Sequence, residues 1–221
     1  MRIEDGRAIL FTGDSITDCG RSRPIGAGSG LGDGYVDFVN ERLAAPSFGR
    51  TVAILNTGIA GDTIVDLASR WKADVLDLAP NWLSVLIGIN DMLRQFDPLQ
   101  SSFGVPLDQY EAIYRELLTQ TRPTLEGLVL MTPYLIEPSR ADPFRVRMDA
   151  YGEVVERLAA AFDAVFVDLQ AAFDRVLIRQ PVGSLTDDRV HPNRAGHSVI
   201  AGAFLSAVGF DVGSGATDPA G

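Results

Sequence analysis

Residues 8–17 read Ala-Ile-Leu-Phe-Thr-Gly-Asp-Ser-Ile-Thr, an apolar run that stops at a glycine and passes directly into two polar residues. The run is short and contains several residues that favour strands, so residues 8–12 are predicted to form a buried strand. Gly13 predicts a turn at the end of that strand, followed by Asp14 and Ser15. In an open α/β sheet, ligands bind beyond the carboxyl ends of the strands, which is where this serine is expected.

Four further runs of the same kind are separated by longer stretches with helical spacing. The four runs are Val52–Asn56, Trp82–Ile87, Gly127–Met131 and Ala164–Val167, and the helical stretches include Leu107–Thr121 and Arg145–Ala161. This alternation predicts an α/β fold, a three-layer α/β/α sandwich around a five-stranded parallel sheet. With a flavodoxin-like strand order of 2-1-3-4-5, the carboxyl ends of the first three strands are neighbours.

Two low-complexity segments interrupt this pattern. We expect one domain over residues 1–212 and a flexible C-terminal tail over residues 213–221, because the tail has too few apolar residues to pack. The segment Gly26–Gly34 is rich in glycine but lacks the Gly-Lys-Ser/Thr ending of a phosphate-binding loop. It is therefore expected to be a flexible loop or part of an active-site rim.

Composition excludes several classes of partner. The 221 residues are 46% hydrophobic and carry a formal charge of −10, without a basic cluster that could bind a nucleic acid. No stretch approaches the roughly 20 apolar residues of a membrane span, and the first residues lack the apolar region of a signal peptide. Cys19 is the single cysteine, which agrees with a reducing compartment. We therefore expect a cytoplasmic protein with no membrane or nucleic-acid partner.

Three side chains of the sequence could form a serine hydrolase site. The hydroxyl of Ser15 needs a base to take its proton, and a histidine serves when an acceptor fixes its tautomer. His191 is the candidate base, and Asp188, three residues before it, can reach Nδ1 and leave Nε2 free. Asp187 is an alternative carboxylate, but the reach of the loop favours Asp188. Because Pro192 favours a first helical turn, His191 is expected at the N-terminal edge of the last helix.

A tetrahedral intermediate carries an oxyanion, which needs hydrogen-bond donors. The candidate donors are the backbone N–H groups of Ser15 and Gly61 and the side-chain amide of Asn90. A glycine at position 61 leaves room for an acyl group, and an amide donates without carrying charge. Asp14 and Asp91 are expected to anchor their loops through hydrogen bonds and to take no part in the chemistry.

Four short motifs stand in order along the chain: Gly13-Asp14-Ser15, Gly61, Gly88-x-Asn90-Asp91 and Asp188-x-x-His191. They resemble the four blocks of the SGNH (GDSL) hydrolase superfamily. More narrowly, residues 11–21, 87–95, 130–134 and 188–192 resemble bacterial acetylxylan esterases of this superfamily that act inside the cell on acetylated xylo-oligosaccharides. The resemblance implies a three-layer α/β/α fold, deacetylation without a metal or cofactor, and a homo-oligomer. The chain departs from these esterases at Leu93, where they usually carry a tryptophan.

Other polar and aromatic residues have simpler interpretations. His197 lies beside an apolar helical stripe and is expected to pack, and Cys19 is expected to pack on the first helix. The α/β-hydrolase fold is excluded because its Gly-x-Ser-x-Gly motif would need a glycine where this chain has Thr17. The large aromatic residues considered for packing against a sugar are Trp71, Trp82, Tyr35 and Tyr134, although Trp82 begins a predicted strand and favours the core.

These residues predict a two-step acyl transfer. His191 accepts the proton of Ser15 during attack on an ester carbonyl, and then protonates the departing sugar oxygen. An acetyl group is favoured because the sequence offers no dry channel for a lipid tail. An esterase, lipase or thioesterase acting on other short-chain acyl esters is the alternative enzyme. A non-catalytic carbohydrate-binding protein on the same fold is the alternative from another class.

Overall fold

Five parallel strands form the centre of the structure, a computed structural model that describes residues 3–45 and 51–210. The strands are β1 (Ala8–Gly13), β3 (Ala53–Asn56), β4 (Trp82–Leu86), β5 (Gly127–Met131) and β6 (Val165–Val167). They lie in the order β3-β1-β4-β5-β6, which is 2-1-3-4-5 when these five are numbered along the chain. The predicted strand order is confirmed. The predicted tail, residues 213–221, lies outside the described residues.

A sixth strand corrects the expectation of a purely parallel sheet. β2 (Gly26–Ala27) pairs antiparallel with β3 at the edge of the sheet, with Gly26 opposite Asn56. It belongs to the glycine-rich segment expected to be a flexible loop. A Cβ on Gly26 would lie 2.6 Å from the carbonyl oxygen of Gly30 and 3.3 Å from the Cβ of Asn56. Glycine at this position therefore permits close backbone packing.

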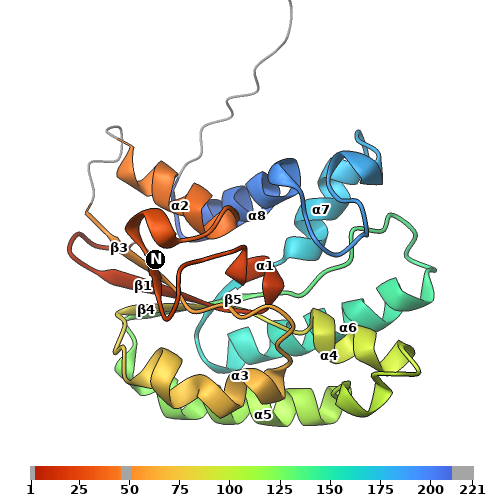
Figure 1. The fold of residues 1–221 in the computed structure, drawn as a ribbon, viewed down its shortest axis with the longest axis horizontal. Helices are drawn as coiled ribbons and strands as arrows, with labels where there is room; N and C mark the ends of the chain where they lie inside the picture. The colour runs from red at the N-terminus through yellow and green to blue at the C-terminus, as the bar shows by residue number, and fades with distance from the viewer. Residues whose placement is uncertain (1–2, 46–50, 211–221) are drawn as a thin grey trace, which may run out of the picture.

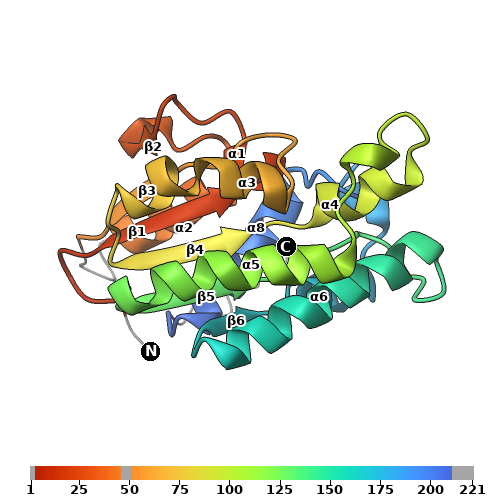
Figure 2. The same cartoon turned by 90° about the horizontal axis from the view of Figure 1, so that it is seen from below.

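Helices cover both faces of the sheet (Figure 1). One face carries α2 (Tyr35–Ala44), α7 (Leu169–Leu177) and α8 (Arg194–Ala207). The other face carries α3 (Ile64–Trp71), α5 (Leu107–Thr121) and α6 (Pro143–Ala161). Two short helices, α1 (Ser15–Asp18) and α4 (Ile89–Leu93), follow the carboxyl ends of β1 and β4 (Figure 2). Single 3-10 or π turns cover Gly28–Gly30, Lys72–Leu76, Arg94–Phe96, Ser101–Phe103, Arg122–Thr124 and Val182–Ser184.

The central strands are buried on both faces, as their continuous apolar runs predicted. Every residue of β4 and β5 is buried. At the end of β1, a Cβ on Gly13 would lie 2.0 Å from the carbonyl oxygen of Leu86. Only a glycine fits there, so the chain leaves β1 in direct contact with the end of β4.

Two buried carboxyls lie beside these strand ends. Asp14 caps α1 by accepting a hydrogen bond from the N–H of Ile16 at 3.0 Å, and Asp91 accepts one from the N–H of Ile64 at 2.9 Å. Their predicted role as loop anchors is confirmed. Burial raises the pKa of each carboxyl to about 7, and the negative charge of Asp91 adds to the effect on Asp14.

The raised pKa of Asp14 predicts a loss of stability as the pH rises. A folded-state pKa of about 7, against 3.8 for the ordinary group, means that the stabilising contribution is present below about pH 4 and is lost as the pH approaches 7. Asp14→Asn keeps an oxygen that can cap α1 but cannot ionise. The native protein should lose about 2 kcal/mol more unfolding free energy than this variant between about pH 5.5 and pH 8.5, measured by urea denaturation. Equal losses in the two proteins would contradict the raised pKa.

Candidate active site

Ser15 stands at the first position of α1, immediately beyond β1. Because Asp14 is the N-cap residue, the backbone N–H of Ser15 lies at the open N-terminal end of that helix. No hydrogen bond between described residues uses this N–H. The serine therefore presents both a hydroxyl and a free backbone donor at the carboxyl end of the sheet.

The structure brings Ser15, His191 and Asp188 into one hydrogen-bonded series, across 176 positions of sequence between serine and histidine. The Oγ of Ser15 lies 3.0 Å from Nε2 of His191, and Nδ1 of His191 lies 2.7 Å from Oδ2 of Asp188. An ionised carboxylate can only accept, so Nδ1 carries the proton and Nε2 of the neutral ring accepts from the serine hydroxyl. Asp188, not the adjacent Asp187, occupies the position next to the histidine.

Backbone donors keep Asp188 ionised. Its Oδ1 accepts hydrogen bonds from the N–H groups of Val190 at 2.9 Å and His191 at 2.7 Å. Burial opposes ionisation, but the hydrogen bonds from the His191 side chain and from these two N–H groups outweigh it and hold the pKa of Asp188 well below its usual range. The carboxylate is thus available to fix the histidine tautomer over the whole neutral range.

Arg189 fixes the loop between Asp188 and His191 from outside. It has a positive φ of 69°, and its Nη1 pairs with Glu137 at 2.8 Å and Asp142 at 3.2 Å. Both carboxylates belong to the connection between β5 and α6. These ion pairs were not predicted from the sequence, because the partners lie some 50 positions away and the motif itself names no role for the arginine.

The expected position of His191 relative to the last helix is wrong. α8 begins at Arg194, and Asn193 is its N-cap, accepting from the N–H groups of Ala195 and Gly196. An asparagine side chain satisfies these N–H groups, which a proline cannot do, so the helix starts after Pro192. His191 consequently lies in the loop before the cap.

Gly61 lies in the loop after β3, and Asn90 lies in the first turn of α4, after β4. Gly61 has a positive φ of 87°, and its N–H makes no hydrogen bond with any described residue. Nδ2 of Asn90 donates to the carbonyl oxygen of Asp62 at 3.0 Å, which leaves its second amide hydrogen free. Arg94, whose role the sequence motif does not indicate, donates to the carbonyl oxygen of Gly61. The loop after β3 and the segment that begins with α4 are therefore tied together.

His197, which is buried, and Cys19, which is partly buried, form a separate pair. Nδ1 of His197 accepts from the N–H of Tyr35 at 3.2 Å, so Nε2 carries the proton and donates to Sγ of Cys19 at 3.2 Å. Burial lowers the pKa of His197 to about 4 and raises the pKa of Cys19 to about 11. The packing roles predicted for both residues are confirmed, although Cys19 follows α1 as its C-cap.

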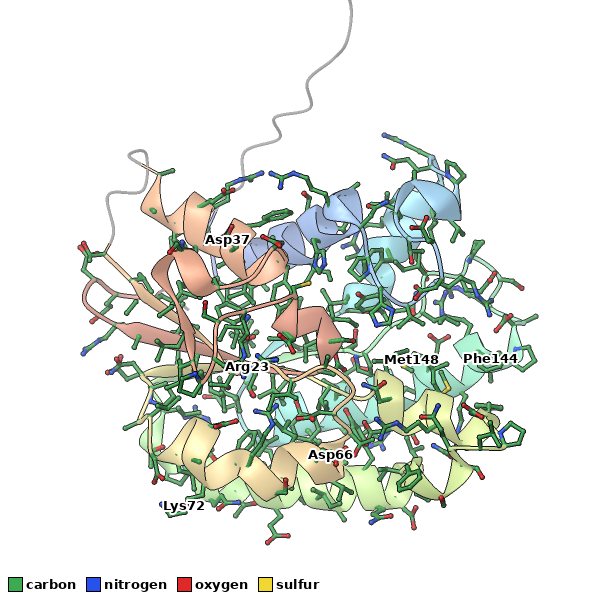
Figure 3. All side chains as sticks on the ribbon, in the orientation of Figure 1. Arg23, Asp37, Asp66, Lys72, Phe144 and Met148 are labelled. Atoms are coloured by element: carbon green, nitrogen blue, oxygen red, sulfur yellow. The ribbon has the colours of Figure 1, made fainter. Side chains whose placement is uncertain are left out.

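The four aromatic residues considered for sugar contact are buried. Trp71, Trp82, Tyr35 and Tyr134 are between 0% and 3% exposed, so sugar contact is wrong for Trp71, Tyr35 and Tyr134, and the core position expected for Trp82 is confirmed. Among the described residues, the exposed aromatic side chains lie on the segment after α4: Phe96 is 46% exposed and Phe103 is 64% exposed. The Phe96 ring packs against the ring of Phe144, which Figure 3 labels at the beginning of α6.

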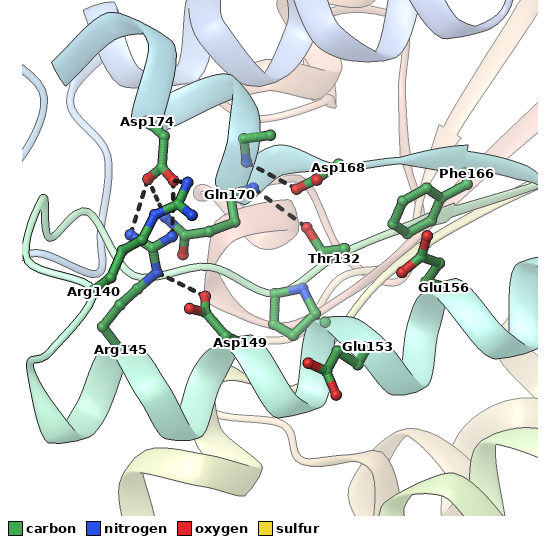
Figure 4. Close-up of a pocket in the computed structure, with 13 residues that line it drawn as sticks. Thr132, Arg140, Arg145, Asp149, Glu153, Glu156, Phe166, Asp168, Gln170 and Asp174 are labelled. Atoms are coloured by element: carbon green, nitrogen blue, oxygen red, sulfur yellow. Dashed lines mark hydrogen bonds and ion pairs between the residues drawn. The ribbon is translucent and has the colours of Figure 1, made fainter. Parts of the chain in front are cut away.

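A polar pocket of about 210 Å³ between α6 and α7 is distinct from this site (Figure 4). Arg145 in its wall is paired with Asp174 through Nη1 and Nη2 at 2.9 and 2.8 Å, and with Asp149 through Nε at 2.7 Å. Ser15, Asn90 and His191 are not among the lining residues. Arg140, Arg145, Asp149 and Asp174 thus pair with one another, and the pocket includes none of the candidate catalytic groups.

Comparisons with known proteins agree with this geometry. The GDSL-like lipase/acylhydrolase family matches residues 11–199. An acetylxylan esterase from Geobacillus stearothermophilus is 48% identical over 216 residues, which cover 96% of this chain and 98% of that protein. The thioesterase 1/protease 1/lysophospholipase L1 of Escherichia coli K12 is 29% identical over 149 residues, 67% of this chain and 64% of that protein.

Solved structures extend the comparison. The crystal structure of the Geobacillus stearothermophilus acetylxylan esterase superposes with a TM-score of 0.93 at 47% identity, covering 96% of this chain and 98% of that one. Three further solved structures are of catalytic mutants of the same enzyme, in which a serine, an aspartate or a histidine is replaced by alanine. Its aspartate and histidine are three positions apart, as Asp188 and His191 are here. The match over most of its length shows that this chain belongs to the GDSL-like lipase/acylhydrolase family.

Proposed function

We propose that this protein is a serine esterase that removes acetyl groups from acetylated xylo-oligosaccharides or related sugars through an acyl-enzyme. The main support for the proposed reaction is the hydrogen-bonded series from Ser15 through His191 to Asp188. The near full-length similarity to an enzyme named an acetylxylan esterase supports the substrate.

The proposed reaction has two steps that use the same groups. Ser15 Oγ attacks the ester carbonyl carbon while its proton passes to Nε2 of His191, and the imidazolium is stabilised by Asp188. His191 then gives this proton to the departing sugar oxygen, leaving an acetyl group on Ser15. A water molecule attacks this ester while its proton passes to Nε2 of His191, which then returns the proton to the departing Oγ of Ser15 and so releases acetic acid and the free serine.

Three donors are proposed to stabilise the oxyanion in both steps: the N–H of Ser15, the N–H of Gly61 and Nδ2 of Asn90. The unused N–H groups of Ser15 and Gly61 support this assignment. So does the fixed orientation of the Asn90 amide, because one hydrogen is held by the carbonyl oxygen of Asp62 and the other is free.

Substitutions of the proposed catalytic groups test the chemistry. Ser15→Ala and His191→Ala should each lower kcat for 4-nitrophenyl acetate by at least about 10³-fold, because the members of a triad act as a unit. Asn90→Ala should lower kcat by about 10²–10³-fold with little change in KM. His197→Asn, in the other histidine, serves as the control and should keep kcat within about threefold. More than a tenth of native activity in Ser15→Ala would favour a different nucleophile or a non-catalytic carbohydrate-binding protein.

A second candidate function uses the same chemistry on a different ester. The similarity to the Escherichia coli protein named thioesterase 1/protease 1/lysophospholipase L1 favours other acyl esters or thioesters. We expect kcat/KM to be highest for acetyl among acetyl, butyryl and octanoyl esters of one leaving group. We also expect acetylated xylobiose to be hydrolysed faster than acetylated glucose. An optimum at octanoyl would reject the short-acyl proposal, and equal rates on the two sugars would reject only the xylan assignment.

We further propose a cytoplasmic homo-oligomer without a nucleic-acid or membrane partner and without a metal or cofactor. The lone cysteine supports a reducing compartment, and none of the helices formed by residues 3–45 and 51–210 could span a bilayer. Exposed apolar side chains at Phe96, Leu99 and Phe103 support an interface beside α4. Light scattering at micromolar concentration should give a multiple of 23.8 kDa, and the monomer mass would reject the oligomer.

A further inference from the structure

Arg70 connects the end of β1 with both ends of the loop between β3 and α3. It lies near the end of α3, and its side chain is 14% exposed. Nη2 donates to the carbonyl oxygen of Gly13 at 3.1 Å, Nη1 donates to that of Thr57 at 2.7 Å, and Nε donates to Oδ2 of Asp62 at 2.7 Å. Nη1 also pairs with Asp74 at 2.7 Å, in the turn that follows α3.

Two of these contacts adjoin the proposed oxyanion donors. Gly13 lies two residues before Ser15, and Asp62 directly follows Gly61. The carbonyl oxygen of Asp62 is also the acceptor that holds the amide of Asn90. The guanidinium of Arg70 therefore fixes the segments next to the N–H donors of Ser15 and Gly61. It is linked to the third donor, the amide of Asn90, through Asp62.

We propose that Arg70 is a positioning residue that sets the spacing of the oxyanion donors. This inference rests on the serine esterase function proposed above. No hydrogen bond or ion pair among the described residues joins Arg70 to Ser15, His191 or Asp188, so it acts through the loops. Oxyanion donors must lie about 2.7–3.1 Å from one developing charge, and displacements of about 1 Å cost roughly 10²-fold in rate.

The geometry requires an arginine. The acceptors lie in different directions around the guanidinium, which presents five N–H donors in a rigid plane. The ammonium of a lysine is a compact charge and cannot reproduce this arrangement. Because Asp62 and Asp74 both pair with Arg70, removal of the guanidinium also leaves the largely buried carboxylate of Asp62 without its counter-ion.

Arg122 provides a matched control within the chain. Its side chain is 25% exposed, its Nε donates to the carbonyl oxygen of Phe162 at 2.7 Å, its Nη1 donates to that of Leu125 at 3.2 Å, and its Nη2 pairs with Asp163 at 3.4 Å. It follows α5 and ties the end of α6 to the segment before β5, at the opposite ends of the strands from the candidate site. Loss of Arg122 should therefore lower stability through the same kind of interaction without changing the geometry of the donors.

The experiment compares Arg70→Ala, Arg70→Lys and Arg122→Ala by Tm and by kcat and KM for 4-nitrophenyl acetate, well below each Tm. Arg70→Ala should lower kcat by about 10²-fold with KM within about threefold, since Arg70 does not contact the substrate. Arg70→Lys should remain at least about tenfold below native kcat. Millimolar guanidinium should restore part of the activity of Arg70→Ala alone. Arg122→Ala should lower Tm but keep kcat within about threefold.

The outcomes separate this inference from the proposed function. Native kcat in Arg70→Ala, or equal loss of kcat in Arg70→Ala and Arg122→Ala, would overturn the positioning role. If Arg70→Ala does not fold, Arg70→Lys and Asp62→Asn carry the test, and native kcat in both would overturn it. Ser15→Ala is measured alongside: native turnover in that variant would reject the esterase itself, independently of Arg70.

Discussion

Parallel pairing of β1 with β3 and β4 is the contact on which the candidate site depends. Gly13 pairs with Leu86, and Phe11 pairs with Asn56, so the three strands end at one edge of the sheet. The ladder continues beyond the strands, because the N–H of Ile59 donates to the carbonyl oxygen of Gly13 at 2.9 Å. Backbone pairing alone therefore brings residues that are far apart in the sequence close together, without any contact between their side chains.

Much of this arrangement could be predicted from the sequence because the controlling signals are local. Buried parallel strands are continuous apolar runs, so the sequence predicts their positions and the three-layer fold. The helix Leu107–Thr121 is predicted with its observed ends. The spacing of Asp188 and His191 predicted their contact because a three-residue separation fixes the reach of the loop. Ser15 was placed correctly because a strand, a glycine and a helix cap follow one another directly.

The features that were missed depend on contacts between distant segments. A two-residue strand such as Gly26–Ala27 has no periodicity and exists only because β3 offers an unpaired edge. The burial of Trp71 could not be predicted from its residue type, because an indole suits both a core and a sugar site. In the structure its Nε1 donates to Oγ1 of Thr121 at 2.8 Å. The contacts of Arg70 and Arg94 could not be predicted either, since each donates to main-chain carbonyl oxygens, which every residue carries.

The charge around the serine must suit a reaction that develops a negative oxyanion. Asp14 and Asp91 are buried beside the proposed donors, and as carboxylates they would oppose that charge. Burial raises the pKa of each to about 7, so below that pH the neutral form dominates and adds no negative charge. Arg70 neutralises Asp62, which is also close by. Below about pH 7 an acidic chain can therefore form an oxyanion site, because Asp14 and Asp91 are mainly protonated and Asp62 is paired with a cation.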